Sequence, residues 1–244
     1  MEPKVALVPG GARGIGRHIA LALAERGWSV AIAYRSSAAP AAEVEAEARR
    51  HGARSLAIAC DISQPAEAER LVRRVEDAWG RIDALVHAAG PYHRVDLLAE
   101  TPEGWDEMFR TNLHSLFYCA RLVAPGMRER RWGRILAFSM AGADRVQAQT
   151  GVTAHFIAKV GVQVLIRSLA RSLAAHGVTA NCISPGFVDS GSAPTEELQK
   201  MLKTIPAGRL GTLADTTAAA LFLLSDEAAY VNGANLVLSG AWGV

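Results

Sequence analysis

The chain has 244 residues, of which 50% are hydrophobic and 20% charged, and its formal net charge is +2. These values predict one globular domain and argue against nucleic-acid binding, which needs a strongly basic surface. Cys60, Cys119 and Cys182 are far apart in apolar surroundings, which predicts free buried thiols and no metal site. No signal-peptide pattern precedes the first apolar segment, and no apolar run reaches the roughly 18 residues of a membrane helix. We therefore expect a soluble cytoplasmic protein with no membrane partner.

Strands and helices are predicted to alternate along the whole chain, because short apolar runs are followed by amphipathic segments that begin or end at Pro or Gly. The expected strands cover 5–8, 28–34, 55–60, 83–90, 133–139, 179–186 and 234–240, and the expected helices 14–26, 40–52, 65–80, about 112–131, 153–176 and about 214–225. This order predicts a single-domain α/β Rossmann fold over residues 1–244, a doubly wound parallel sheet of about seven strands with helices on both faces. Residues 190–203 form the most loop-like insert, which we expect to be a substrate lid.

The first strand runs into a glycine-rich turn, PGGARGIGRHIA at 9–20. Gly10, Gly14 and Gly16 follow a strand and open a helix, where glycines permit a tight turn and let a pyrophosphate approach the helix N-terminus. A merely flexible loop is the alternative, but the position in the first crossover favours a dinucleotide site.

The end of the second strand, AYRSS at 33–37, indicates which dinucleotide binds. Enzymes that use NAD usually carry a carboxylate there to accept from the ribose 2′-hydroxyl, and this strand has none. Arg35, Ser36 and Arg13 can instead bind a 2′-phosphate. We therefore expect NADPH as the cofactor; the alternative is that Arg35 is an ordinary surface arginine.

The spacing Gly-x-x-x-Gly-x-Gly resembles the short-chain dehydrogenase/reductase family, with Pro9 where the family commonly has Thr. The resemblance spans essentially the whole chain. Residues 206–243 are similar to the 3-oxoacyl-acyl-carrier-protein reductase branch, which uses NADPH and forms tetramers. The resemblance therefore implies an NADP-dependent oxidoreductase that forms a homotetramer, with a mixed oligomer as the alternative.

The resemblance also implies where NADPH binds. CDIS at 60–63 is placed at the adenine, HAAG at 87–90 follows the fourth strand, and SPGFVDS at 184–190 is placed at the nicotinamide amide. His87 departs from the family pattern, and we expect it to be a satisfied strand-end histidine. The implied cofactor-binding residues are Gly10, Arg13, Gly14, Ile15, Gly16, Arg35, Ser36, Asp61, Ile62, Ala89, Gly90, Lys159, Pro185, Gly186, Val188 and Ser190.

The family carries out carbonyl reduction with Asn, Ser, Tyr and Lys, and the resemblance places Asn112, Ser139 and Lys159 in three of these roles. The serine segment is one residue shorter than usual, so Met140 is an alternative occupant of the serine position. His155 stands where the Tyr belongs, four residues before Lys159 and on the same helix face. The expected catalytic residues are therefore Asn112, Ser139, His155 and Lys159.

A histidine at position 155 leaves the reaction open. Its charged form is a good acid near neutral pH, but Lys159 disfavours a second positive charge, and the imidazole is about 2 Å shorter than a phenol. We expect slow NADPH-dependent reduction of a small carbonyl compound or a 3-oxoacyl thioester. One alternative is a non-catalytic NADPH-binding protein that acts as a sensor or partner subunit. Another is a different NADPH reaction, such as reduction of a pterin-like ring or an activated double bond.

Overall fold

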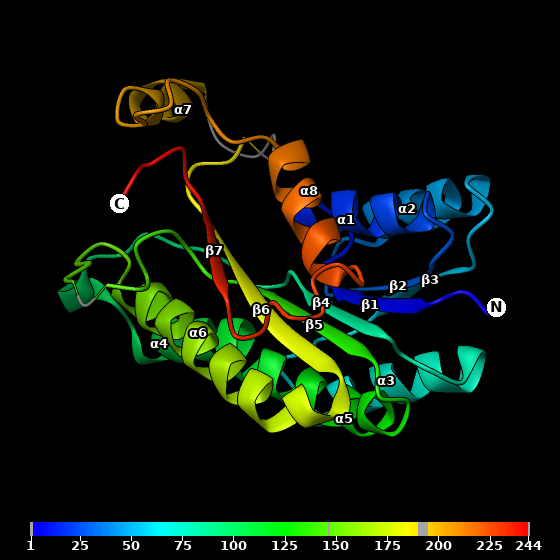
Figure 1. Cartoon of the computed structure of the whole chain (residues 1–244). Coiled ribbons are helices and arrows are strands. Elements are labelled where there is room, and N and C mark those ends of the chain that lie inside the picture. The colour runs from blue at the N-terminus through cyan, green and yellow to red at the C-terminus, as the bar shows by residue number, and fades with distance from the viewer. Residues whose placement is uncertain (1, 146, 190–194, 244) are drawn as a thin grey trace.

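The computed structural model describes residues 2–145, 147–189 and 195–243. Its centre is a parallel sheet of seven strands in the order β3-β2-β1-β4-β5-β6-β7 (Figure 1). The strands are β1 (Val5–Pro9), β2 (Ser29–Tyr34), β3 (Ser55–Ala59), β4 (Ala84–His87), β5 (Gly133–Phe138), β6 (Val178–Pro185) and β7 (Asn235–Leu238). The predicted doubly wound Rossmann sheet is confirmed, and its strand order reverses between β1 and β4.

Helices cover both faces of the sheet (Figure 1). One layer contains α1 (Gly14–Ala24), α2 (Ala38–Arg50) and α8 (Leu213–Leu224), and the other contains α3 (Pro65–Trp79), α4 (Pro102–Phe109), α5 (Ser115–Glu129) and α6 (Thr153–Leu173). Side chains of β1 alternate between the two layers, because successive strand residues face opposite sides. Val5 and Leu7 pack in the α3–α5–α6 core, and Ala6 and Val8 pack in the α1–α2–α8 core.

Two helices differ from the sequence prediction. The helix expected over about 112–131 begins earlier, because Pro102 can occupy a first helical turn and the Thr101 hydroxyl accepts from the Gly104 amide. A π-helical turn over Arg110–His114 then joins α4 to α5. The insert expected to be loop-like contains α7 (Thr195–Leu202), which stands apart from both layers at the top of Figure 1. Residues 190–194 of that insert lie outside the described part.

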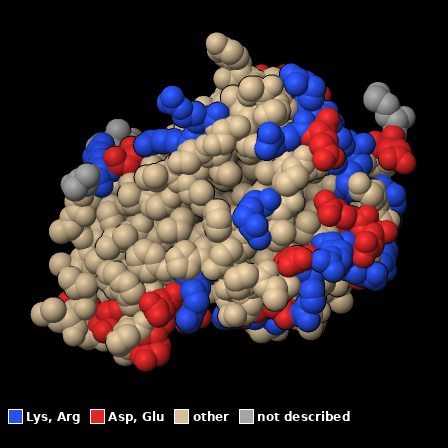
Figure 2. Space-filling model, turned by 90° about the horizontal axis from the view of Figure 1, so that it is seen from below, with Lys and Arg blue, Asp and Glu red and all other residues tan. Residues whose placement is uncertain are grey.

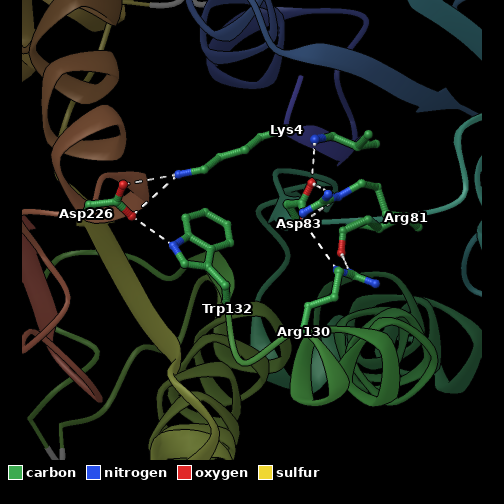
Figure 3. Close-up of polar contacts among 8 residues, drawn as sticks. Lys4, Arg81, Asp83, Arg130, Trp132 and Asp226 are labelled. Carbon is green, nitrogen blue, oxygen red and sulfur yellow. Dashed lines mark hydrogen bonds and ion pairs between the residues drawn. The ribbon is translucent and has the colours of Figure 1, made fainter. Parts of the chain in front are cut away.

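Polar contacts fasten the amino-terminal edge of the sheet (Figure 3). Asp83 is fully buried before β4 and accepts from the Val5 amide and from the Arg81 Nε, both at 2.8 Å. The Nε of Arg130, at the end of α5, lies 3.5 Å from the same carboxylate. One buried anion therefore ties β1, β4 and α5 together at the edge opposite the strand ends that carry the functional residues.

Lys4, Trp132 and Asp226 make a second polar contact at the same end of the sheet. Lys4 lies 3.9 Å above the Trp132 ring, and the Trp132 indole donates to Asp226 at 2.8 Å.

The three cysteines are buried and unpaired, as predicted. Within the described residues, no helix is long and apolar enough to cross a membrane, and no cluster of metal-ligating side chains was found.

Candidate active site

An open cleft of about 940 Å³ lies at the carboxyl ends of the first strands. Open α/β sheets bind their ligands in this crevice, at the point where the strand order reverses. Eleven of the residues expected to bind the cofactor line it: Gly10, Arg13, Gly14, Ile15, Gly16, Arg35, Ser36, Asp61, Ile62, Ala89 and Gly90. The fold thus brings together side chains that come from four separate loops.

The N-terminus of α1 has free backbone amides that can bind an anion. Its N-cap, Arg13, has extended backbone angles and makes no side-chain cap, so the first amide groups of the helix stay available. Gly10 has φ +81°, and a Cβ there would lie 2.6 Å from the Ala89 nitrogen. A Cβ on Gly16 would collide with the Gly10 carbonyl. The glycines therefore hold the turn close to the end of β4, and the residues present fit a pyrophosphate.

The outer end of the cleft carries the predicted 2′-phosphate residues. β2 ends at Tyr34, and Arg35 and Ser36 follow it on the cleft wall. Arg13 makes no ion pair with any described residue, whereas the Arg35 Nη1 lies 3.5 Å from the Glu107 Oε1 of α4. Glu107 was missed in the sequence because α4 was not predicted, and the TPE sequence at 101–103 is the signal that could have revealed that helix.

The inner end of the cleft adjoins Asn112. The π-helical turn that holds this residue is a feature often found at functional sites. Its Nδ2 donates to the Met108 carbonyl at 3.1 Å and to the Pro91 carbonyl at 3.2 Å. Its buried Oδ1 has no hydrogen-bond partner among the described residues. A Cβ on Gly90, where φ is +151°, would collide with this oxygen, so Gly90, which lines the cleft, packs directly against the buried Asn112 only because it has no side chain.

Lys159 and His155 project from α6, and both are buried. The Lys159 Nζ donates to the Phe138 carbonyl at 2.9 Å, and burial lowers the pKa of this lysine to about 8. Burial, followed by the positive charge of Lys159, lowers the pKa of His155 to about 3. The imidazole is therefore neutral near pH 7, and its buried Nδ1 has no partner among the described residues.

Comparisons with known proteins agree with this geometry. A family model described as enoyl-(acyl carrier protein) reductase matches residues 10–241. The 3-oxoacyl-acyl-carrier-protein reductase of Staphylococcus epidermidis is 36% identical, over 97% of this chain and 98% of its own. The Escherichia coli enzyme of the same name is 33% identical over 243 residues, 98% of this chain and 97% of its own. A putative short-chain alcohol dehydrogenase from Sinorhizobium meliloti superposes with a TM-score of 0.91 at 31% identity, covering 99% of this chain and 97% of that one.

The chain belongs to the short-chain dehydrogenase/reductase family. It is therefore an oxidoreductase that uses a nicotinamide cofactor, as its sequence predicted. The residues assigned to individual roles in this short-chain oxidoreductase remain predictions, and the structure shows where each one lies.

Ser139 is held by the helix that carries the predicted lysine of the short-chain oxidoreductase. Its hydroxyl donates to the Lys159 carbonyl at 2.9 Å and accepts from the Gln163 Nε2 at 3.1 Å. The single hydroxyl proton of Ser139 is therefore used in the hydrogen bond to the backbone of α6 and is not free to bind a substrate. This geometry favours the alternative in which Met140 occupies the position of the family's catalytic serine.

His87 has the structural role expected for it. Ser115 donates its hydroxyl proton to the Thr111 carbonyl at 2.7 Å, so its oxygen accepts from the Nε2 of His87, 2.8 Å away. Burial lowers the pKa of His87 to about 3. This neutral, hydrogen-bonded histidine fixes the end of β4 against α5.

The loop expected at the nicotinamide follows β6 and is supported from behind by β7. The Gly186 amide donates to the Leu238 carbonyl at 2.9 Å, and a Cβ on Gly186 would lie 2.9 Å from the Ser239 Cα. Val188 forms an isolated bridge with Gly211. Pro185, at the end of β6, and Gly186 and Val188, on the loop after it, therefore lie outside the cleft lining. Ser190 is outside the described residues.

Proposed function

We propose that this protein is an NADPH-dependent reductase of a carbonyl substrate that resembles a 3-oxoacyl thioester, and that it acts in the cytoplasm. The observation that carries the proposal is the cleft itself. Its outer end presents Arg13, Arg35 and Ser36 with no carboxylate on the β2 end, and its inner end adjoins Asn112. The relatives named as 3-oxoacyl-acyl-carrier-protein reductases support the substrate class.

The chain's own residues supply the binding groups for the cofactor. The free amides at the start of α1 would hold the pyrophosphate, and the guanidinium groups of Arg13 and Arg35 would hold the 2′-phosphate. Asp61 lines the same cleft and would contact the adenine; its Oδ1 accepts from the Ser63 amide at 3.1 Å. Bound NADPH supplies the hydride.

His155 polarises the substrate carbonyl as a neutral hydrogen-bond donor. A buried imidazole whose pKa is lowered can act in this way without being charged, as the neutral histidine of triosephosphate isomerase does. The Nδ1 of His155 lacks a partner, and a carbonyl oxygen would satisfy it when this nitrogen carries the proton. A neutral imidazole is a weak acid, so we expect turnover to be slower than with a tyrosine, while Lys159 keeps a positive charge beside the developing oxyanion.

The alternative is a protein that binds NADPH without turning it over, and two features of the site would be consistent with it. The pKa of His155, about 3, removes the imidazolium acid. The Ser139 hydroxyl is committed to α6. A protein with this site could bind NADPH as a sensor or as the partner subunit of a mixed oligomer.

We further propose that the protein is a homotetramer that uses the α4–α6 face. Figure 2 views the molecule from below and shows a broad area without charged side chains over this part, with charges gathered mainly at one side. Phe117 of α5 and Ile157 and Val164 of α6 are 47%, 42% and 57% exposed. Exposed apolar side chains on a charge-poor face are typical of an interface between subunits. Light scattering during gel filtration tests this, and Val164→Glu should lower the mass.

Stopped-flow oxidation of NADPH with a panel of 3-oxoacyl thioesters tests the reductase. His155→Tyr restores a phenol, and His155→Phe is the matched control that adds a ring without a hydroxyl. We expect measurable turnover in the wild type, at least tenfold more in His155→Tyr, and none in His155→Phe. A silent wild type with an active His155→Tyr would favour the non-catalytic candidate. If NADPH binds but neither protein reacts, the substrate class is wrong.

A further inference from the structure

An acidic residue outside the cleft lining contacts the arginine at the outer end of the cleft. Glu107 lies on the last turn of α4, and its Oε1 is 3.5 Å from the Nη1 of Arg35. The two side chains come from elements 72 residues apart, and 56% of the arginine side chain and 41% of the glutamate side chain are exposed. The residue expected to bind a 2′-phosphate is therefore already paired with a carboxylate.

Glu107 lies one helical turn before a residue that lines the cleft. Thr111, four residues later, lines the cleft and donates its hydroxyl to the Glu107 carbonyl at 2.6 Å. Residues four apart share one face of a helix, and the contact with Arg35 fixes the direction of the Glu107 side chain. The carboxylate therefore stands within ion-pair distance of the residue expected to bind the 2′-phosphate.

We propose that Glu107 sets how strongly the protein discriminates between NADPH and NADH. The proposal rests on the assignment of Arg35 to the 2′-phosphate. An anion bound by Arg35 must share the guanidinium with Glu107 or displace it, and it lies within about one Debye length, roughly 8 Å, of that negative charge. Both effects weaken the binding of a 2′-phosphate.

The same carboxylate does not oppose a ribose that carries a free 2′-hydroxyl. Carboxylates at this end of a dinucleotide site accept from that hydroxyl, although they usually come from the end of the second strand. Glu107 therefore lowers the ratio of NADPH to NADH affinity below the ratio that Arg13, Arg35 and Ser36 would give without it.

Binding titrations with adenosine 2′,5′-bisphosphate and adenosine 5′-monophosphate test this without any turnover. Glu107→Gln should tighten the bisphosphate about two- to fivefold, the range expected for an exposed ion pair, and leave the monophosphate unchanged. The ratio of NADPH to NADH affinity should rise by the same factor, and the gain should shrink in high salt. Glu103→Gln removes the same charge one turn earlier on α4, from an exposed side chain, and should have no effect.

Arg35→Gln separates the two proposals. If it weakens the bisphosphate while Glu107→Gln changes nothing, the role of Glu107 is refuted and the NADPH assignment stands. An equal rise in bisphosphate affinity in Glu103→Gln would also refute the role of Glu107, because the rise would then come from the lower net negative charge and not from the contact with Arg35. If Arg35→Gln leaves the bisphosphate affinity unchanged, the assignment of Arg35 fails, and the inference about Glu107 fails with it.

Discussion

The rings of His155 and Tyr92 meet edge to face, with their centroids 5.1 Å apart and their planes at 88°. Tyr92 belongs to the loop after β4, and the carbonyl of its neighbour Pro91 accepts from Asn112. The tyrosine ring thus covers the histidine that replaces the family's tyrosine, and it contributes to the burial that keeps the imidazole neutral.

Removing the Tyr92 ring should raise the pKa of His155. In Tyr92→Ala, water reaches the imidazole, and its pKa should move from about 3 toward the ordinary value near 6.5. Tyr92→Phe keeps the ring and should leave this pKa low. A pH titration of the histidine signals by NMR measures both variants. An unchanged pKa in Tyr92→Ala would show that the Tyr92 ring does not contribute to the burial that lowers it.

The protein should lose stability below about pH 6.5 because two buried histidines resist protonation. The pKa values of His155 and His87 are both lowered to about 3 in the folded state, so the unfolded chain binds more protons between pH 6.5 and pH 3. The free energy of unfolding should fall by about 1.4 kcal/mol per pH unit for each histidine. Urea unfolding from pH 7 to pH 4.5 checks this.

A buried and an exposed histidine can be compared to test the origin of that pH dependence. His155→Phe should halve the slope between pH 6.5 and pH 5.5, where most carboxylates have not yet titrated. His18→Gln, at an exposed position of α1, should leave the slope unchanged. Equal slopes in the wild type and His155→Phe would contradict a neutral, buried His155.

Ser139→Ala should affect stability more than turnover. The substitution leaves the Nε2 of Gln163 without its acceptor in a buried site, which costs about 1–3 kcal/mol. Gln163→Leu removes the same contact from the other side, and the double variant should cost less than the sum. If Ser139→Ala instead lowered kcat a hundredfold at unchanged Tm, Ser139 would be the catalytic serine and Met140 would not occupy its position.

Asp83→Asn should lower the Tm strongly while NADPH binding is retained. The substitution leaves Arg81 and Arg130 without their buried anion, and breaking such an interaction costs about 3–5 kcal/mol. Glu69→Gln is the matched control, because Glu69 and its partner Arg73 are 55% and 69% exposed, and this substitution should cost less than about 1 kcal/mol. Calorimetric melting measures both variants. Similar melting temperatures would show that Asp83 does not anchor this edge of the sheet.

The fold was predictable because its signals are local. Each buried strand is a short apolar run, and α3 has Pro65 in its first turn and is followed by Gly80 in a left-handed conformation. The glycines of the first turn also predicted the position of the cleft. The strand-to-helix turn packs so closely that a Cβ at Gly10 or Gly16 would collide with the backbone. The helix α4 was not predicted, although Thr101 is a typical N-cap and Pro102 is typical of a first helical turn.

The sequence by itself determined the architecture, the location of the phosphate turn and the absence of a tyrosine before Lys159. Only the tertiary structure decided the electrostatic state of the site, since a pKa depends on burial and on charges brought close from distant segments. Tyr92 and Lys159 surround His155 from two elements, and α4 brings Glu107 to Arg35 across 72 residues. The local sequence around each of these residues does not determine the distances between them, because the packing of the helices against the sheet sets those distances.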